Sequence, residues 1–157
     1  MRAVLQITEK AKLTCEGKII SECGKGMCIL LGLHQNDTKK EADKAIDKLL
    51  KMRIFHDENG KLNLSALKVG ADILVVSNFT LYANLASRRP DFMQSMKYEP
   101  AKELYEYFLS KMQNEANALR EDGDPEVKIF PGVFGGDMKV EIINDGPITI
   151  VVDTDQL

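Results

Sequence analysis

A short polar segment that directly follows an apolar run is the first place in this chain where chemistry could be carried out. Ser77-Asn78-Phe79-Thr80-Leu81 follows the continuous apolar run Ile73-Leu74-Val75-Val76. Such a run is typical of a strand buried on both faces, and ligand groups often lie at the carboxyl ends of strands in open α/β sheets. Two interpretations stay open: the segment forms a ligand site, or it only caps a strand. Taken alone, the segment favours the cap.

A second segment interrupts regular structure near the carboxyl end. Asn144-Asp145-Gly146-Pro147-Ile148-Thr149 is rich in turn formers, so a hairpin turn is the simpler interpretation. An X-Pro peptide bond can also take the rare cis form, which redirects the neighbouring main-chain carbonyl oxygens. Such oxygens could accept hydrogen bonds from the ammonium group of a substrate.

Familiar catalytic side-chain sets are not found. The histidines His34 and His56 belong to no metal-binding or catalytic pattern, and there is no nucleophile elbow, phosphate-binding glycine loop or dinucleotide fingerprint. Cys15, Cys23 and Cys28 lack C-x-x-C spacing, which argues against a zinc ribbon or a disulfide framework. We therefore expect no metal, no cofactor and no side-chain triad.

The elements that must position these segments are strand-rich at the start of the chain. Apolar or alternating runs predict strands at residues 2–8, 11–15, 18–23 and 27–33, and the turn formers between them favour an antiparallel meander. Thr38 with Glu41 three residues later has the pattern of a capping box. The helix that follows is amphipathic, with apolar residues at helical spacing: Ala42, Ala45, Ile46, Leu49 and Leu50.

The second half of the chain adds one strand, one helix and a closing pair of strands. Residues 72–77 read as a buried strand. A helix from about Pro100 to Leu119 carries one apolar stripe: Leu104, Phe108, Met112 and Ala116. Residues 139–143 and 148–153 read as two strands joined by the tight turn 144–147. No repeat or linker interrupts this pattern, so we expect a single α/β domain over residues 1–157.

Composition restricts the class of protein without identifying a function. The chain is 44% hydrophobic and 29% charged, proportions of a soluble globular domain. The net charge of −3 neither indicates nor excludes RNA, since a local basic patch can hold a nucleic acid on an acidic protein. No apolar run approaches the ~20 residues of a membrane span. We expect a cytoplasmic protein with no membrane partner.

The two motifs and their surroundings resemble the D-aminoacyl-tRNA deacylases, the D-tyrosyl-tRNA(Tyr) deacylase family. The segment 77–81 is similar to the family's S-Q-F-T-L, and 144–149 to its N-x-G-P-x-T. The remaining matches follow in the family's order: Met1-Arg2-Ala3-Val4-Leu5-Gln6, Gly32, Asp37-Thr38, Arg53-Ile54-Phe55, Gly60-Lys61-Leu62-Asn63, Arg89-Pro90-Asp91-Phe92 and Phe134-Gly135-Gly136-Asp137-Met138.

This resemblance implies a fold and an activity. The fold would have mixed, mostly antiparallel sheets and two main helices in β/β/α layers. The activity would be that of a proofreading carboxylic ester hydrolase, which cleaves a D-amino acid, or glycine, from the 3'-terminal adenosine of tRNA. The protein would be a homodimer with active sites at the subunit interface, where Gly146 and Pro147 of one subunit enter the pocket of the other. Their carbonyls would hold the substrate ammonium so that an L-side chain collides with the wall.

The resemblance also implies roles for individual residues. Ser77, Phe79 and Thr80 would be catalytic, with main-chain amides near Phe79 and Thr80 stabilising the oxyanion and the 2'-hydroxyl of the adenosine helping to activate water. Thr80 as a covalent nucleophile is the competing view, but no partner base is evident. Arg88, Arg89 and Lys97 either contact phosphates or form a solvated cluster. The substrate-binding residues would be Asn78, Phe134, Gly135, Gly136, Met138, Asn144 and Thr149.

Two departures from the family pattern affect the expected selectivity. Asn78 is one methylene shorter than the usual glutamine, and Ile7 stands where the family commonly has an arginine that orients the Gly-Pro carbonyls. We expect weaker chiral discrimination from the second change. Two alternatives stay open: a proofreading deacylase for small L-amino acids, and a non-enzymatic module that binds RNA ends or protein partners.

Overall fold

The computed structural model describes residues 1–157, and its centre is one long strand, β1 (Arg2–Cys15). Along one edge β1 pairs with β8 (Met138–Asp153) over its whole length. Along the other edge it pairs first with β3 (Gly26–Gly32) and then with β2 (Lys18–Cys23), all antiparallel. The sheet continues in parallel from β3 to β6 (Asp72–Ser77) and β7 (Lys128–Pro131).

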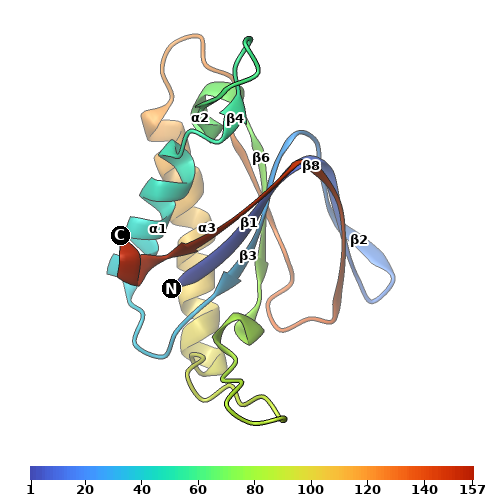
Figure 1. Ribbon diagram of the computed structural model, residues 1–157, viewed down its shortest axis with the longest axis vertical. Helices are drawn as coiled ribbons and strands as arrows, with labels where there is room; N and C mark the ends of the chain where they lie inside the picture. The colour runs from blue at the N-terminus through green and yellow to red at the C-terminus, as the bar shows by residue number, and fades with distance from the viewer.

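Two helices cover one face of this sheet (Figure 1). The helices α1 (Lys39–Lys51) and α3 (Tyr98–Leu119) pack against each other, and the main core of 27 buried residues lies between them and the strands. The predicted stripes of both helices are buried, and the Thr38 capping box is present. Helix α3 begins at Tyr98 rather than at about Pro100. None of the helices, α3 included, has an apolar stretch long enough to cross a membrane.

Four shorter elements complete the chain. The hairpin of β4 (Phe55–His56) and β5 (Leu62–Leu64) precedes a single helical turn, α2 (Ala66–Val69). The 3-10 turn η1 (Phe79–Tyr82) follows β6 directly, and a second 3-10 turn, η2 (Thr154–Gln156), follows β8.

A second core lies on the other side of the sheet, where β2 and the second half of β1 fold over β6 and β7. Its buried members are Ala11, Leu13, Cys23, Cys28, Leu74 and Val76. The Ser21 hydroxyl donates to the Pro131 carbonyl at 2.8 Å and joins the two layers. Burial raises the pKa of Cys23 to about 12 and that of Cys28 to about 11, so both thiols stay protonated and unreactive at neutral pH.

The predicted meander at the start of the chain is wrong in two respects. Residues 2–8 and 11–15 belong to one strand, and β2 and β3 follow one another along this strand instead of pairing with each other. The exposed residues Glu9 and Lys10 resemble a turn in the sequence. In the structure they lie where the pairing of β1 with β8 changes register, so the strand bends there and continues.

The predicted hairpin at residues 144–147 is also wrong. Gln6 pairs with Thr149 and Thr8 pairs with Asn144, so residues 145–148 lie opposite Ile7 alone. Both halves of β8 therefore run in the same direction along β1, and residues 145–148 form a large bulge, called here the β8 bulge. The Asn144 side-chain amide donates to the carbonyls of Ile7 and Ile148, both at 3.0 Å, and fixes its base.

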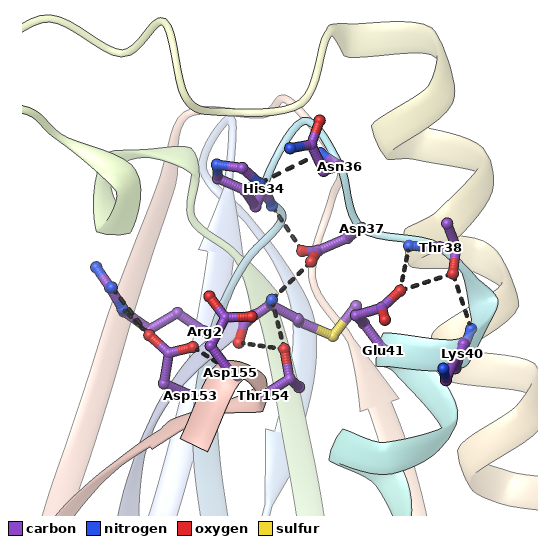
Figure 2. Close-up of polar contacts among 11 residues, drawn as sticks. Arg2, His34, Asn36, Asp37, Thr38, Lys40, Glu41, Asp153, Thr154 and Asp155 are labelled. Atoms are coloured by element: carbon purple, nitrogen blue, oxygen red, sulfur yellow. Dashed lines mark hydrogen bonds and ion pairs between the residues drawn. The ribbon is translucent and has the colours of Figure 1, made fainter. Parts of the chain in front are cut away.

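The two ends of the chain meet at a buried ion pair (Figure 2). The Met1 ammonium donates to Asp37 Oδ1 and to the Thr154 hydroxyl, both at 2.7 Å. Asp37 Oδ2 accepts from the His34 main-chain N–H at 2.7 Å. The relative exposure of the ion-paired groups is 0% for Met1 and 6% for Asp37, so solvent screens this pair only weakly.

Replacing Asp37 with alanine should therefore lower the free energy of unfolding substantially. Removing one partner of a buried ion pair leaves the other charge uncompensated, at a typical cost of about 3–5 kcal/mol. Asp47→Ala is the matched control, because Asp47 forms an exposed pair with Lys51 within α1, and such a pair is worth about 0.3–0.5 kcal/mol. Urea denaturation measures both variants, and equal destabilisation by the two would contradict this assignment.

Candidate active site

A groove of about 1050 Å³ lies where the strands of the sheet meet the start of α3. Its walls come from the ends of β3 and β6, from η1, from residues 92–101 and from the loop before β8. Seven of the residues predicted to form the site line it: Ser77, Asn78, Phe79, Phe134, Gly135, Gly136 and Met138. Segments far apart in the sequence are thus brought to one place.

The turn η1 is seated directly on β3. The Asn78 main-chain N–H donates to the Leu31 carbonyl at 2.8 Å, and the Ser95 hydroxyl donates to the Phe79 carbonyl at 2.9 Å. A Cβ atom at Gly32 would lie 2.9 Å from the Leu81 Cβ and 3.2 Å from the Asn78 carbonyl oxygen. Only glycine at position 32 lets the turn approach the strand so closely.

Thr80 lies beside this groove with its hydroxyl already engaged. The hydroxyl donates to the Asn78 side-chain carbonyl oxygen, which is an amide oxygen and not a base. Asn78, the residue that is shorter than the family's glutamine, thus turns its amide toward Thr80. Nothing in this pair would remove a proton from the hydroxyl, and the geometry therefore favours an orienting role for Thr80.

Tyr98 and Phe134 form an aromatic wall of the groove, and the sequence did not indicate Tyr98. The Tyr98 ring packs edge-on against Phe134, with ring centroids 5.2 Å apart, and covers Gly135, where a Cβ atom would lie 2.7 Å from the ring. Tyr105 supports Phe134 from below at 5.5 Å and donates to the Val75 carbonyl at 2.8 Å. Burial raises the pKa of Tyr105 to about 12, so its hydroxyl remains a donor.

The charges of the groove are few. Asp37 and Lys97 are the only ionisable carboxyl and amino groups that line it. Asp37 is paired with the Met1 ammonium, whereas Lys97 has no acidic partner. Arg88 and Arg89 are exposed and do not line the groove. No group of three or more histidine, cysteine, aspartate or glutamate side chains is placed to hold a metal ion.

The remaining predicted site residues lie elsewhere in the same chain. Asn144, Gly146, Pro147 and Thr149 belong to the β8 bulge and its edge, and none of them lines the groove. The Gly146-Pro147 peptide bond is cis, and both residues are exposed. Within one chain, the structure therefore places the predicted site residues in two separate groups.

The chain matches the family model described as D-Tyr-tRNA(Tyr) deacylase over residues 4–153. Two solved structures share the fold. One, titled c-Myc DNA unwinding element binding protein, is 38% identical, with a TM-score of 0.87 and 98% of both chains covered. Another, titled as a probable eukaryotic D-amino acid tRNA deacylase, has a TM-score of 0.79 over 96% of this chain and 97% of its own; at 18% identity it supports the fold alone.

Curated relatives carry one name. The D-aminoacyl-tRNA deacylase of Thermosipho melanesiensis is 44% identical over 155 residues, which cover 98% of this chain and 97% of the relative. That of Clostridium beijerinckii is 42% identical, with the same coverage. Because both the family model and these relatives span nearly the whole chain, the chain belongs to the D-Tyr-tRNA(Tyr) deacylase family.

Proposed function

We propose that this protein is a D-aminoacyl-tRNA deacylase, a cytoplasmic proofreading enzyme that hydrolyses the ester between a D-amino acid, or glycine, and the 3'-terminal adenosine of tRNA. The observation that carries the proposal is the groove, which is lined both by the strand-end segment Ser77–Phe79 and by the loop Phe134–Met138. The relatives named for this activity match the chain over nearly its full length.

Main-chain N–H groups of η1 stabilise the transition state in this proposal. Phe79 and Thr80 are the first two residues of the turn, and the leading N–H groups of a helical turn have no partner within it. Aimed at the ester carbonyl, such donors hold the oxyanion that forms when water attacks. The ester is already activated, so orientation and the neighbouring 2'-hydroxyl are enough without a strong base.

The terminal adenosine lies against the aromatic wall. An unpaired base of RNA is commonly recognised by stacking on aromatic side chains, and Phe134 and Tyr98 present rings at the groove. Lys97, the groove cation without an acidic partner, is suited to the phosphate of the terminal nucleotide.

Chiral selection comes from a second subunit. In one chain the β8 bulge lies away from the groove, so Gly146 and Pro147 reach a groove only in another copy. Large apolar side chains near the bulge favour such a contact, since Ile143 is 51% and Val151 is 62% exposed on β8. We propose a homodimer in which the carbonyls of Gly146 and Pro147 hold the substrate ammonium and leave no room for an L-side chain.

The family's arginine is replaced here by a core residue. Ile7 is 5% exposed, and its side chain packs in the main core, so it offers no hydrogen bond to the β8 bulge. Asn144 anchors the bulge instead, through the carbonyls of Ile7 and Ile148. Because this anchor binds at the base and not at the tip, we propose weaker chiral discrimination than in relatives with arginine.

A deacylation assay with matched esters tests the proposed function. We expect purified protein to release D-tyrosine or D-aspartate from tRNA and to cleave glycyl-tRNA as well, because glycine has no side chain to collide with the wall. L-tyrosyl-tRNA should be spared. L-alanyl-tRNA should be cleaved slowly at high enzyme concentration if the replacement at Ile7 loosens selection.

The other outcomes would support a different function or a different mechanism of selection. Preferential cleavage of L-alanyl-tRNA would support a deacylase for small L-amino acids, and binding of tRNA without any turnover would support a non-enzymatic module. Glycyl-tRNA that survives where a D-ester is cleared would disprove selection by collision.

The role of Thr80 is tested by Thr80→Val, which keeps the shape and removes the hydroxyl. If Thr80 only orients Asn78 and the turn, kcat should fall by about five-fold, in line with the loss of one hydrogen bond worth about 1 kcal/mol. Loss of a nucleophile typically costs several orders of magnitude. Single-turnover rates on a D-aminoacyl-tRNA measure the difference, and a folded variant with no detectable rate would establish the nucleophile.

Subunit mixing tests whether the β8 bulge acts in trans. One variant carries Gly135→Val, which blocks the groove, and the other carries Gly146→Val, which alters the bulge; each homodimer should be inactive. Random reassociation makes half of the dimers mixed, each with one intact site, so about a quarter of the wild-type activity should return. If mixing restores nothing although mass spectrometry shows mixed dimers, the bulge does not act across the interface.

A further inference from the structure

We propose that Arg2 is a positioning residue of the active site. It holds the turn η1 in the orientation in which its N–H groups point at the reacting oxygen. This inference rests on the proposed function, because it concerns the turn whose amides stabilise the oxyanion. Arg2 lies on β1, outside the motifs that resemble the family's active site, and does not line the groove. Its side chain reaches the back of η1 instead.

The guanidinium of Arg2 binds two acceptors at once. Its Nη1 donates to the Leu81 main-chain carbonyl at 2.9 Å. Its Nε and Nη2 both donate to Asp153 Oδ2, at 3.1 and 2.9 Å (Figure 2). The guanidinium carbon also lies 4.9 Å from the centroid of the Tyr82 ring, within cation–π distance. Arg2 therefore contacts the last two residues of η1 and the end of β8 together.

The turn has few other hydrogen bonds at this end. Inside it, Leu81 N–H donates to the Asn78 carbonyl at 3.4 Å, which is long, and Ala83 N–H donates to the Thr80 carbonyl at 3.1 Å. The anchors from Leu31 and Ser95 hold only its beginning, at Asn78 and Phe79. Among the hydrogen bonds formed by side chains, only the one from Arg2 holds the far end of the turn.

The frame against which Arg2 holds the turn is the sheet itself. Arg2 and Asp153 are direct partners in the pairing of β1 with β8, and Arg2 is also the partner of Gly32 on β3. Burial alone would raise the pKa of Asp153. Hydrogen bonds from the Asp155 N–H and from Arg2, with the charges of Arg2 and of the Met1 ammonium, outweigh burial and lower that pKa, so Asp153 remains a carboxylate.

Only arginine fits this double task. Its planar fork carries several N–H donors in fixed directions, whereas the lysine ammonium is a single point of charge. Lysine at position 2 could reach the Leu81 carbonyl or Asp153, but it would not fix both in one plane. A movement of η1 displaces its amides from the reacting oxygen, while the aromatic wall that binds the adenosine, on other elements, is left in place.

The kinetic test compares Arg2→Met and Arg2→Lys with the wild type on one D-aminoacyl-tRNA. Loss of an oxyanion donor costs about 10²–10³ in kcat, so a misplaced one should cost Arg2→Met about ten- to a hundred-fold in kcat, with KM changed less than about two-fold. Arg2→Lys should fall between Arg2→Met and the wild type. Arg53→Met is the matched control, because Arg53 also donates to a main-chain carbonyl, that of Asn63, away from the groove; its kcat should be unchanged.

A second measurement does not depend on activity. Amide hydrogen exchange of residues 79–83 should accelerate by about ten-fold in Arg2→Met, since opening of the turn loses about one hydrogen bond to a charged group. In Arg53→Met the acceleration should be confined to residues near Asn63. Exchange is compared under conditions where urea denaturation shows each variant fully folded, so that a general loss of stability does not contribute.

These measurements separate the two proposals. A wild-type protein without deacylase activity would end the proposed function, and the exchange experiment would still decide whether Arg2 holds the turn. Unchanged exchange at residues 79–83, unchanged kcat, or a rise in KM with kcat preserved would overturn the role of Arg2. If Arg2→Met does not fold, Asp153→Asn takes its place: it keeps Arg2 but weakens its orientation, and the same outcomes then apply with a smaller fall in kcat.

Discussion

The pairing of β1 with β8 is the interaction on which the rest of the structure depends. It runs from Arg2 opposite Asp153 to Cys15 opposite Met138 and so joins the first strand of the chain to the last. At one end it places Arg2 and Asp153 behind the turn η1. At the other end it brings Met138 to the groove. The β8 bulge lies between these two points. One strand therefore contributes residues to the back of η1, to the groove and to the bulge.

This arrangement explains how an exposed segment can have a fixed position. Gly146 and Pro147 are exposed, but ladder pairs hold the strand on both sides of the bulge, at Asn144 and Thr149. The side chain of Asn144 joins the two sides through the carbonyls of Ile7 and Ile148. A hairpin tip would be held at one end only. A bulge between two paired segments is held at both ends, and under the proposed function this suits a group that enters another subunit at a defined place.

Local patterns predicted the local elements well. The Thr38 capping box and the apolar spacing of α1 depend on residues three or four apart, and both predictions are confirmed. The buried stripe of α3 and the continuous apolar run of β6 are confirmed for the same reason. The family resemblance in turn indicated the groove segments, and seven of their predicted residues line one groove in the structure.

Features decided by distant partners were not predictable in the same way. Turn formers at residues 144–147 fit a hairpin and a bulge equally well, and only the pairing of both halves with β1 selects the bulge. Tyr98 belongs to no motif, and its place in the groove depends on Phe134, which lies on another segment. Arg2 was noted as part of a matching segment, but its contact with the Leu81 carbonyl, across a separation of 79 residues, exists only in the fold.

The charges of the groove fit recognition by shape more than by electrostatic attraction. The chain carries a net charge of −3, and the groove carboxylate of Asp37 is paired with the Met1 ammonium. What remains in the groove is Lys97 and an aromatic wall. A protein that tracks the phosphates of RNA needs many cations and loses affinity steeply with salt. One cation and an aromatic wall instead suit a single unpaired nucleotide. Under the proposed function, the protein therefore recognises the end of the acceptor strand and makes few contacts with the rest of the tRNA.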